Sequence, residues 1–377
     1  MTSRWIWQHP EWPRFHWQDA ELLPRLREIQ QQRGLLLGRA GLQPDDESQQ
    51  TLDTLLANIL SSSAIEEEKV NALSVRSSLA RRLGVTEAQP WPVSDRSEGL
   101  AAMMLDAIDN REQPLTTERL CQWHRWLFPQ DEKSVHTLGV GVLRGSDTMQ
   151  VVSGRIDRPV VHFEAPPRDG LEQQLQQFID WFASSQHDVL LDPLLRAAIG
   201  HLWFVTLHPF DDGNGRITRA LTDLALSQAD SQSIRLYAMS PAILTRRASY
   251  YRILEQTQKG DLDITDWLSW FLDTLNKSLS EAIASVGRTQ VKARFWLRNR
   301  NTTLSKEQSK VLNRLLDGGE QGFEAGISAS QYQKVAKVSK ATATRHLSDL
   351  LEKGCIEKLE GGGRSTRYQI AAEFALR

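Results

Sequence analysis

The chain has 377 residues, of which 40% are hydrophobic and 24% charged, a composition typical of soluble globular proteins, and its length favours two or three domains. The net charge of −2 excludes a polyanion-binding character for the molecule as a whole, so any basic surface must be local. The two cysteines, Cys121 and Cys355, are too few and too far apart for a disulfide framework or a cysteine zinc site, and they suit a reducing cytoplasm. Since the chain has no long apolar run and no apolar signal core, no membrane partner is expected.

The first 40 residues are rich in tryptophan. Pro10 and Pro13 break any helix at the start, whereas residues 19–37 carry apolar side chains at helical spacing. The tryptophans are Trp5, Trp7, Trp12 and Trp17. Because aromatic side chains bury large areas, we expect them to pin an irregular segment onto a helical body. A peptide-binding groove is the alternative.

Two helices are expected between residues 48 and 84. The sequence Leu-Ser-Ser-Ser at 60–63 predicts a break between them, and Gly84 predicts the end of the second. Residues 88–95 contain two prolines and read as a connector.

Helical periodicity then returns over residues 96–128, with Thr116 or Thr117 as an N-cap inside this stretch. Residues 138–167 are the most strand-like part of the chain before its C-terminal region, because glycines and valines replace the helical pattern. A helix is predicted over 169–184.

The next helix begins at Asp192 and Pro193, which suit the N-cap and first-turn positions, and it ends just before His208. The segment 208–219 that follows reads His-Pro-Phe-Asp-Asp-Gly-Asn-Gly-Arg-Ile-Thr-Arg. It predicts a loop with an acid and two glycines that leads into a new helix at about Asn214.

This segment has the chemistry of a triphosphate site. Glycines allow backbone N–H groups to approach an anion, and a helix N-terminus adds unpaired donors and a positive dipole end. Arg216 and Arg219 lie on one face of the new helix and can fork onto phosphate oxygens. Asp212 is a natural Mg²⁺ ligand beside phosphate, and His208 can act as a general base near neutral pH.

The segment resembles the Fic family motif His-x-Phe-x-Asp/Glu-Gly-Asn-Gly-Arg-x-x-Arg at every fixed position. The resemblance implies that His208 deprotonates a Ser, Thr or Tyr hydroxyl of a protein target, which attacks the α-phosphorus of ATP, so that AMP stays on the target and pyrophosphate leaves. It also implies Mg²⁺ held by Asp212 and a γ-phosphate held by Arg219. The residues implied to hold the α- and β-phosphates are Gly213, Asn214, Gly215 and Arg216. Phe210 is expected to anchor the loop in the core, and His201 to be a packed histidine. The alternative to a nucleotide site is that residues 208–219 form a plain helix–loop–helix turn.

Two further segments resemble parts of the family's nucleotide site. Residues 138–167 resemble the β-hairpin flap over the active site, which could hold a target segment as an added strand. The flap residues expected near the nucleotide are Val152, Ser153 and Gly154. Tyr250 and Gln258 resemble the base-side segment, with Tyr250 against adenine. A surface hairpin and ordinary helix packing are the respective alternatives.

Residues 62–66, Ser-Ser-Ala-Ile-Glu, resemble the family's inhibitory helix motif Ser/Thr-x-x-x-Glu-Gly/Asn. The resemblance implies that Glu66 pairs with Arg219 and blocks productive placement of the γ-phosphate. The next residue is Glu67 and not Gly or Asn, which puts the local turn in doubt. The alternative is that Ser63 and Glu66 form a capping box. In some relatives the same glutamate supports removal of AMP, and the sequence leaves this open.

The C-terminal region resembles a winged helix-turn-helix over residues 328–370. Its expected elements are a helix at 330–337, a recognition helix at 341–353 and a wing hairpin, and residues 330–368 carry eight Lys or Arg against four Asp or Glu. The candidate DNA contacts are Lys340, Thr342, Thr344, Arg345, Arg364 and Arg367. A protein-interaction or dimer module is the alternative.

We therefore expect a mainly α protein: a Fic-type helical bundle with a β-hairpin flap, plus a C-terminal winged helix domain. The expected parts are an N-terminal helical segment with the inhibitory helix (1–90), a catalytic core (91–280), a basic linker helix (281–302) and the winged helix (303–377). The predicted function is self-inhibited protein adenylyl transfer, with ATP as substrate and Mg²⁺ as cofactor. A nucleotide-sensing DNA-binding regulator is the alternative, and a homo-oligomer is left open.

Overall fold

The structure is a computed structural model, and it describes residues 5–40, 47–87, 89–129, 139–155, 158–230, 235–318, 323, 325–359 and 366–372. Two compact units are present, Met1–Ala282 and Ile283–Arg377, and each is described by itself. Helices dominate the described part of the chain, which confirms the mainly α prediction. None of the described helices combines the length and the apolar character that a membrane-spanning segment needs.

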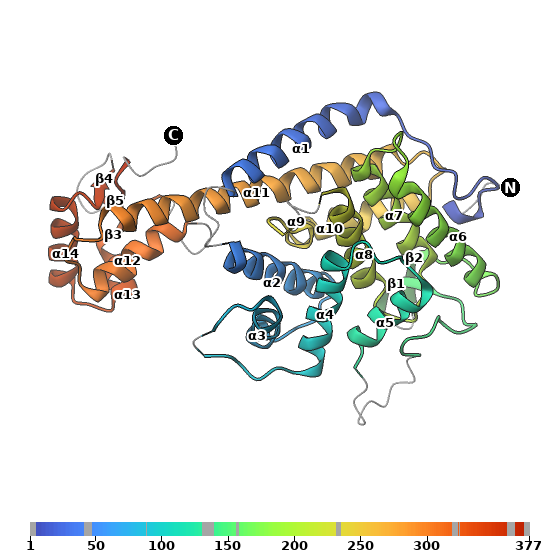
Figure 1. The fold of residues 1–377 in the computed structure, drawn as a ribbon, viewed down its shortest axis with the longest axis horizontal. Helices are drawn as coiled ribbons and strands as arrows, with labels where there is room; N and C mark the ends of the chain where they lie inside the picture. The colour runs from blue at the N-terminus through green and yellow to red at the C-terminus, as the bar shows by residue number, and fades with distance from the viewer. Residues whose placement is uncertain are drawn as a thin grey trace. The chain divides into compact units, whose positions relative to one another are not determined.

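The first unit is a bundle of helices with one β-hairpin (Figure 1). Its helices are η1 (Ile6–Gln8), α1 (Asp19–Ala40), α2 (Glu47–Ile65), α3 (Ala72–Leu83), α4 (Asp95–Asp109), α5 (Thr117–Leu127), α6 (Leu171–Ser184), η3 (Ser185–His187), α7 (Pro193–Leu207), α8 (Asn214–Ala229), α9 (Met239–Thr245), α10 (Arg247–Gln258) and α11 (Thr265–Arg298), which continues into the second unit. The hairpin consists of β1 (Gln150–Arg155) and β2 (Arg158–Glu164), paired antiparallel with a bulge between Val151 and Val152.

Helices α7 and α8 form the centre of the bundle. Every residue of α7 from Leu194 to Leu207 is buried, as expected for a helix that is apolar on all sides. Helix α8 packs against α7 and against α4, so both ends of the loop that joins α7 to α8 are held in the core. That loop carries the motif at 208–219.

Several helix ends follow the sequence signals. The Thr116 hydroxyl accepts a hydrogen bond from the Arg119 N–H and caps α5, and Asp192 caps α7 ahead of Pro193 in its first turn. Gly84 ends α3 in the left-handed conformation, with φ of 71°. These local signals hold because each is satisfied within a single turn of chain.

One expectation about the elements is wrong. Residues 60–63 do not break the helix, because α2 runs unbroken to Ile65 and buries Ser62 and Ser63. The hairpin expected within 138–167 is present: its strands occupy 150–155 and 158–164, whereas residues 140–142 form a turn.

The tryptophan-rich start packs on the helical body, as expected. Trp5 is 1% exposed and meets Phe163 of β2 edge to face at 5.5 Å. Trp12 contacts Trp203 of α7 at 6.2 Å, beside a cavity of about 750 Å³ that Trp17 also lines. Peptide binding in that cavity stays a prediction.

The second unit contains a three-helix cluster on a small sheet. Its elements are α12 (Lys306–Asp317), β3 (Ile327–Ser328), α13 (Ala329–Ala336), α14 (Lys340–Glu352), β4 (Ile356–Lys358) and β5 (Arg367–Ile370), with strand order β3-β5-β4. The expected helices at 330–337 and 341–353 are α13 and α14, whereas β3 was not foreseen. The expected linker helix is the C-terminal part of α11, and Phe295 of that part is fully buried in the core of this unit.

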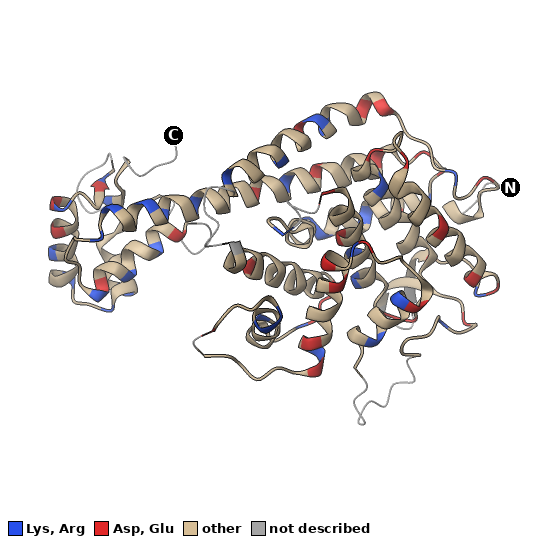
Figure 2. Cartoon of the chain, in the orientation of Figure 1, with Lys and Arg blue, Asp and Glu red and all other residues tan. Residues whose placement is uncertain are grey.

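Basic and acidic residues are interspersed over α12 and α14, whereas Lys334 is the charged residue of α13 (Figure 2). Lys340, Thr344 and Arg345 are exposed on α14, and Thr342 is partly buried. Arg367 lies on β5, while Arg364 lies outside the described residues. The winged-helix assignment and DNA binding stay predictions.

Candidate functional site

His208 stands at the exit of α7 in a strained backbone conformation. It is the C-cap of that helix in the left-handed region, with φ of 50° and ψ of 56°. Its Nδ1 donates a hydrogen bond to the Val205 carbonyl oxygen at 3.1 Å, since a carbonyl can only accept. The ring is therefore the tautomer whose Nε2 is free to accept a proton.

The surroundings of His208 keep its ring uncharged near neutral pH. Burial lowers its pKa below the ordinary value of 6.5, and Arg144 adds to this effect. The Arg144 guanidinium, 1% exposed, donates to the carbonyl oxygens of His208 at 2.9 Å and of Pro166 at 2.6 Å. Arg144 therefore ties the start of the motif loop to the segment after the hairpin.

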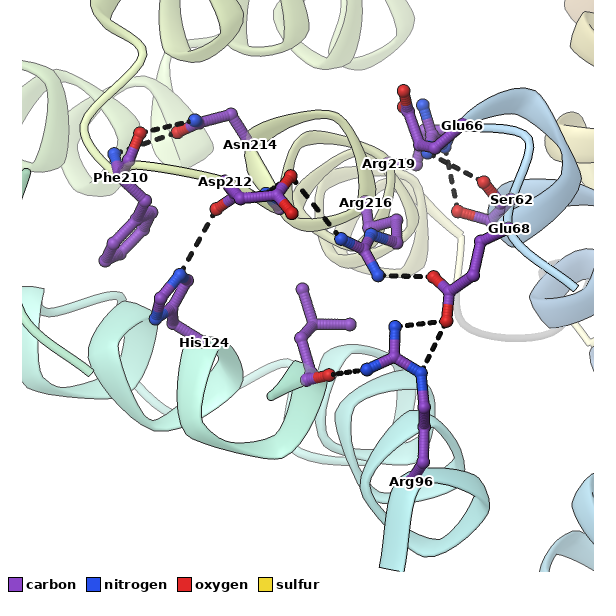
Figure 3. A network of polar contacts seen from close by, with 12 residues as sticks. Ser62, Glu66, Glu68, Arg96, His124, Phe210, Asp212, Asn214, Arg216 and Arg219 are labelled. Atoms are coloured by element: carbon purple, nitrogen blue, oxygen red, sulfur yellow. Dashed lines mark hydrogen bonds and ion pairs between the residues drawn. The ribbon is translucent and has the colours of Figure 1, made fainter. Parts of the chain in front are cut away.

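The loop between His208 and α8 is closed by hydrogen bonds to its own backbone and to α5. The Asn214 side chain exchanges hydrogen bonds with the Phe210 N–H at 3.0 Å and the Phe210 carbonyl at 2.7 Å. Phe210 is fully buried and stacks on the His124 ring at 4.5 Å, as expected for a core anchor. His124 in turn donates from Nε2 to the Asp212 carbonyl oxygen at 3.2 Å (Figure 3). The Asn214 side chain is thus occupied in shaping the loop.

The start of α8 has the form of an anion site. Gly213 is its N-cap at φ of 80°, where a Cβ would lie 2.8 Å from the Phe128 ring. The first turn leaves backbone N–H groups unpaired within the helix. Arg216 and Arg219 follow on one face, with 5% and 3% of their side chains exposed. Among the described residues, Arg216 Nε has no hydrogen-bond partner, although it is buried.

Glu66 occupies Arg219 in this structure. Its Oε1 lies 2.8 Å from Arg219 Nη2, and its Oε2 accepts a hydrogen bond from the Tyr251 hydroxyl at 3.0 Å. Arg219 also donates to the hydroxyl and the carbonyl oxygen of Ser62, at 2.8 Å and 2.9 Å. Burial alone would raise the Glu66 pKa, but Arg219 and Tyr251 outweigh it and lower that pKa, so the carboxylate stays charged. A Cβ on Gly215 would lie 2.2 Å from Glu66 Oε1, so only glycine admits this approach.

A Schellman motif at the end of α2 brings Glu66 to this place. The Glu68 N–H bonds to the Ser63 carbonyl oxygen, and the Glu67 N–H bonds to the Ala64 carbonyl oxygen, both at 3.0 Å. Glu67 is in the left-handed conformation with φ of 60°. A capping box at Ser63 and Glu66 is therefore wrong, because these residues end a helix instead of beginning one.

The two glutamates after Glu66 also pair with arginines. Glu67 contacts Arg247 of α10 at 3.1 Å, and Glu68 contacts Arg216 at 2.5 Å as well as Arg96 of α4 (Figure 3). The sequence analysis missed Glu68, His124, Arg96 and Arg144. No local motif marks these residues, and only the acidic triplet at 66–68 would have drawn attention to Glu68.

A cavity of about 730 Å³ lies between the hairpin, the motif loop and α10. Its lining brings together the predicted residues His208, Asp212, Gly213, Asn214, Gly215, Val152, Ser153, Tyr250, Gln258 and Glu66. The predicted residues Gly154, Arg216 and Arg219 are outside this lining. Tyr250 is only 1% exposed and bonds through its hydroxyl to His201 Nε2 at 2.8 Å, so it offers little ring surface to a base.

His201 itself is a packed histidine, as expected. Its Nδ1 lies 2.8 Å from the Thr222 hydroxyl, and its Nε2 contacts Tyr250. Burial lowers its pKa to about 3. The ring is therefore neutral at physiological pH and takes no part in the site.

The donor set fits Mg²⁺ only together with a phosphate ligand. Among the described residues, no group of three or more His, Cys, Asp or Glu side chains could hold a metal ion. The Asp212 carboxylate is 59% exposed and faces the cavity, which suits an ion that takes one or two carboxylates plus phosphate oxygens.

Two family profiles match the chain. Residues 5–85 match a domain of unknown function, DUF4172, and residues 114–226 match the Fic/DOC family. Among solved structures, a Fic family protein from Desulfovibrio desulfuricans G20 has a TM-score of 0.53 at 20% identity, over 93% of this chain and 96% of that chain. This likeness shows the fold.

Curated relatives are similar over part of the chain. Protein adenylyltransferase fic-1 of Caenorhabditis elegans is 33% identical over 126 residues, which are 32% of this chain and 23% of that protein. Protein adenylyltransferase Fic of Nematostella vectensis is 36% identical over 104 residues, which are 27% of this chain and 22% of that protein. The chain thus spans less than a quarter of the length of these two relatives.

Proposed function

We propose that the chain is a self-inhibited protein adenylyltransferase, because residues 114–226 match the Fic/DOC family. It would transfer AMP from ATP to a Ser, Thr or Tyr hydroxyl of a protein target. The observation that carries this proposal is the pairing of a neutral histidine with a phosphate cradle across one cavity. His208 presents a free Nε2 there, and the α8 N-terminus lines the same cavity, with Arg216 and Arg219 buried further along α8.

The transfer would be one displacement at phosphorus. His208 Nε2 takes the proton of the target hydroxyl, whose oxygen forms a bond to the α-phosphorus of ATP. The bond from the α-phosphorus to the bridging oxygen breaks, and pyrophosphate leaves with that electron pair. Backbone N–H groups at Gly213 and Gly215, with Arg216, would hold the α- and β-phosphates. Arg219 would hold the γ-phosphate.

Asp212 would hold Mg²⁺ beside these phosphates. The ion, when bound, neutralises charge on the leaving pyrophosphate. Arg216 Nη2 lies 3.6 Å from Asp212 Oδ1, a loose contact that would let the carboxylate bind Mg²⁺ while it stays beside Arg216.

Glu66 would keep this reaction slow. A γ-phosphate and the Glu66 carboxylate compete for the same guanidinium of Arg219, and the two anions repel each other. Glu66 Oε1 also lies only 2.2 Å from where a Cβ on Gly215 would be, so the carboxylate sits against the first turn of α8, where the phosphates would bind. Whether Glu66 also supports removal of AMP is left open.

The hairpin would align the target. Val152 and Ser153 line the cavity on β1, and Ser153 is linked through His162 to Glu255 of α10, at 2.6 Å and 2.9 Å. These bonds hold the hairpin beside the base side of the cavity, where Gln258 lies. An extended target segment could add to this hairpin by main-chain bonds.

Labelled nucleotides test the type of reaction. The Glu66→Gly variant would be incubated with Mg²⁺ and either α-³²P-ATP or γ-³²P-ATP. We expect label on protein only from the α-labelled nucleotide, because adenylyl transfer releases the γ-phosphate in pyrophosphate. Label from γ-³²P-ATP would show phosphoryl transfer and overturn the proposal.

A further inference from the structure

The acidic triplet at 66–68 contacts the two motif arginines from different directions. Glu66 borders the cavity, whereas Glu68 is not among the residues that line it. In Figure 3, Glu68 lies between Arg216 and Arg96, and Asp212 lies on the other side of the Arg216 guanidinium. Arg216 is not among the lining residues either, but its neighbour Asp212 is. Glu68 therefore holds Arg216 without filling the cavity, and Arg216 approaches the cavity through its Asp212 side.

Glu68 is itself held rigidly. Its carboxylate bridges Arg216 and Arg96, and Arg96 Nη1 donates to the Leu127 carbonyl oxygen at 2.6 Å. Both guanidinium groups lie over the Phe128 ring, at 5.0 Å for Arg216 and 5.8 Å for Arg96. The Glu68 N–H is fixed by the Schellman bond to Ser63.

The Arg216 nitrogen that Glu68 contacts determines which edge of the guanidinium stays free. Glu68 binds Nη1 at 2.5 Å, which leaves the edge formed by Nε and Nη2. On that edge, Nε has no partner among the described residues, and Nη2 has only the 3.6 Å contact with Asp212. A guanidinium forks onto a phosphate with two neighbouring N–H groups, and this edge supplies such a pair.

We propose that Glu68, fixed by Arg96, is a positioning residue that orients Arg216 so that its Nε–Nη2 edge faces the phosphates. The proposal rests on the proposed function. It gives neighbouring glutamates opposite effects: Glu66 opposes nucleotide binding at Arg219, and Glu68 supports it at Arg216. Without Glu68, the long Arg216 side chain would lose its fixed rotamer and a share of its affinity for phosphate.

The test compares nucleotide dependence in the uninhibited background. Glu68→Gln and Arg96→Gln would each be made on Glu66→Gly, and the self-labelling rate measured against ATP concentration. By analogy with residues that orient metal ligands, we expect KM for ATP to rise on the order of ten-fold, with a smaller change in kcat. Since both changes disturb one bridge, the double variant should lose little more than either single variant. Glu98→Gln is the matched control, because Glu98 also bridges two arginines, Arg81 and Arg82, away from the cavity.

A measurement of ATP affinity distinguishes failure of this proposal from failure of the proposed function. Affinity for ATP with Mg²⁺ would be measured by calorimetry on Glu66→Gly/His208→Ala, with and without Glu68→Gln, after melting curves show that each variant is folded. Weaker binding with Glu68→Gln supports the positioning role of Glu68, even if no variant labels itself. Absent labelling would count only against the proposed transferase activity. Unchanged affinity, or activation by Glu68→Gln in the chain that keeps Glu66, would overturn the proposal. If Glu68→Gln does not fold, Arg96→Gln decides in its place.

Discussion

At the scale of single residues, the backbone geometry of His208 suits the proposed role of a base. The left-handed C-cap turns its ring out of α7, and the bond to the Val205 carbonyl leaves Nε2 unprotonated. The sequence could predict this residue because the motif is contiguous. It could not predict His124, Arg144 or Glu68, which reach the motif from distant segments and depend on how the helices pack.

The pH dependence of the reaction follows from the His208 environment. Because burial lowers the pKa of His208 below 6.5, the neutral base persists when the pH falls through that value. We expect the self-labelling rate of Glu66→Gly to stay level from pH 8 to pH 6.5 and to fall only below it. The measurement is the initial rate at saturating ATP across this range, with melting curves at each pH as the control. An acid limb with its midpoint above 6.5 would contradict the pKa direction.

At the scale of elements, the end of α2 explains a departure from the family pattern. Glu67, the position after Glu66, is left-handed here, a conformation that glycine and asparagine adopt readily and glutamate does not. The left-handed conformation explains why the motif has Gly or Asn at this position. Glu67 adopts the same turn with conformational strain. From the sequence, the helix was expected to break at 60–63, because a run of serines resembles a cap. In the structure this segment stays helical, because Arg219 bonds to the hydroxyl and the carbonyl oxygen of Ser62.

Replacing Glu67 with glycine should strengthen the turn. Relief of the left-handed strain should raise the free energy of unfolding by about 0.5–1 kcal/mol. This net gain already includes a small loss, because the exposed ion pair with Arg247 is removed. Urea unfolding would measure the gain, and basal self-labelling should fall because Glu66 is held more firmly. Glu67→Ala is the matched control: it loses the same ion pair and keeps the strain, so it should not gain stability. Equal effects of the two changes would contradict this account.

At the scale of the whole molecule, the chain joins a helical unit that carries the candidate site to a smaller unit with its own hydrophobic core. The helices of the second unit were predictable from periodicity and capping, but β3 was not, since its two residues are too few for a pattern.

The alternative of a DNA-binding regulator is tested by titration. Labelled duplex DNA would be titrated with the full chain at two salt concentrations, with Lys340→Gln/Arg345→Gln as the matched variant. A winged helix that binds DNA should lose affinity steeply as salt rises, because phosphate contacts release counterions, and the variant should bind more weakly. Salt-independent or absent binding would contradict the regulator and leave a protein-interaction module.

The central claim, that Glu66 restrains a reaction that needs His208, is tested most directly by self-labelling with α-³²P-ATP and Mg²⁺. Wild type, Glu66→Gly and Glu66→Gly/His208→Ala would be compared at equal concentration. We predict weak labelling of the wild type, a rise of at least about ten-fold with Glu66→Gly, the equivalent of roughly 1.4 kcal/mol, and loss of that rise without His208. Equal labelling of wild type and Glu66→Gly, or labelling that survives His208→Ala, would contradict the account.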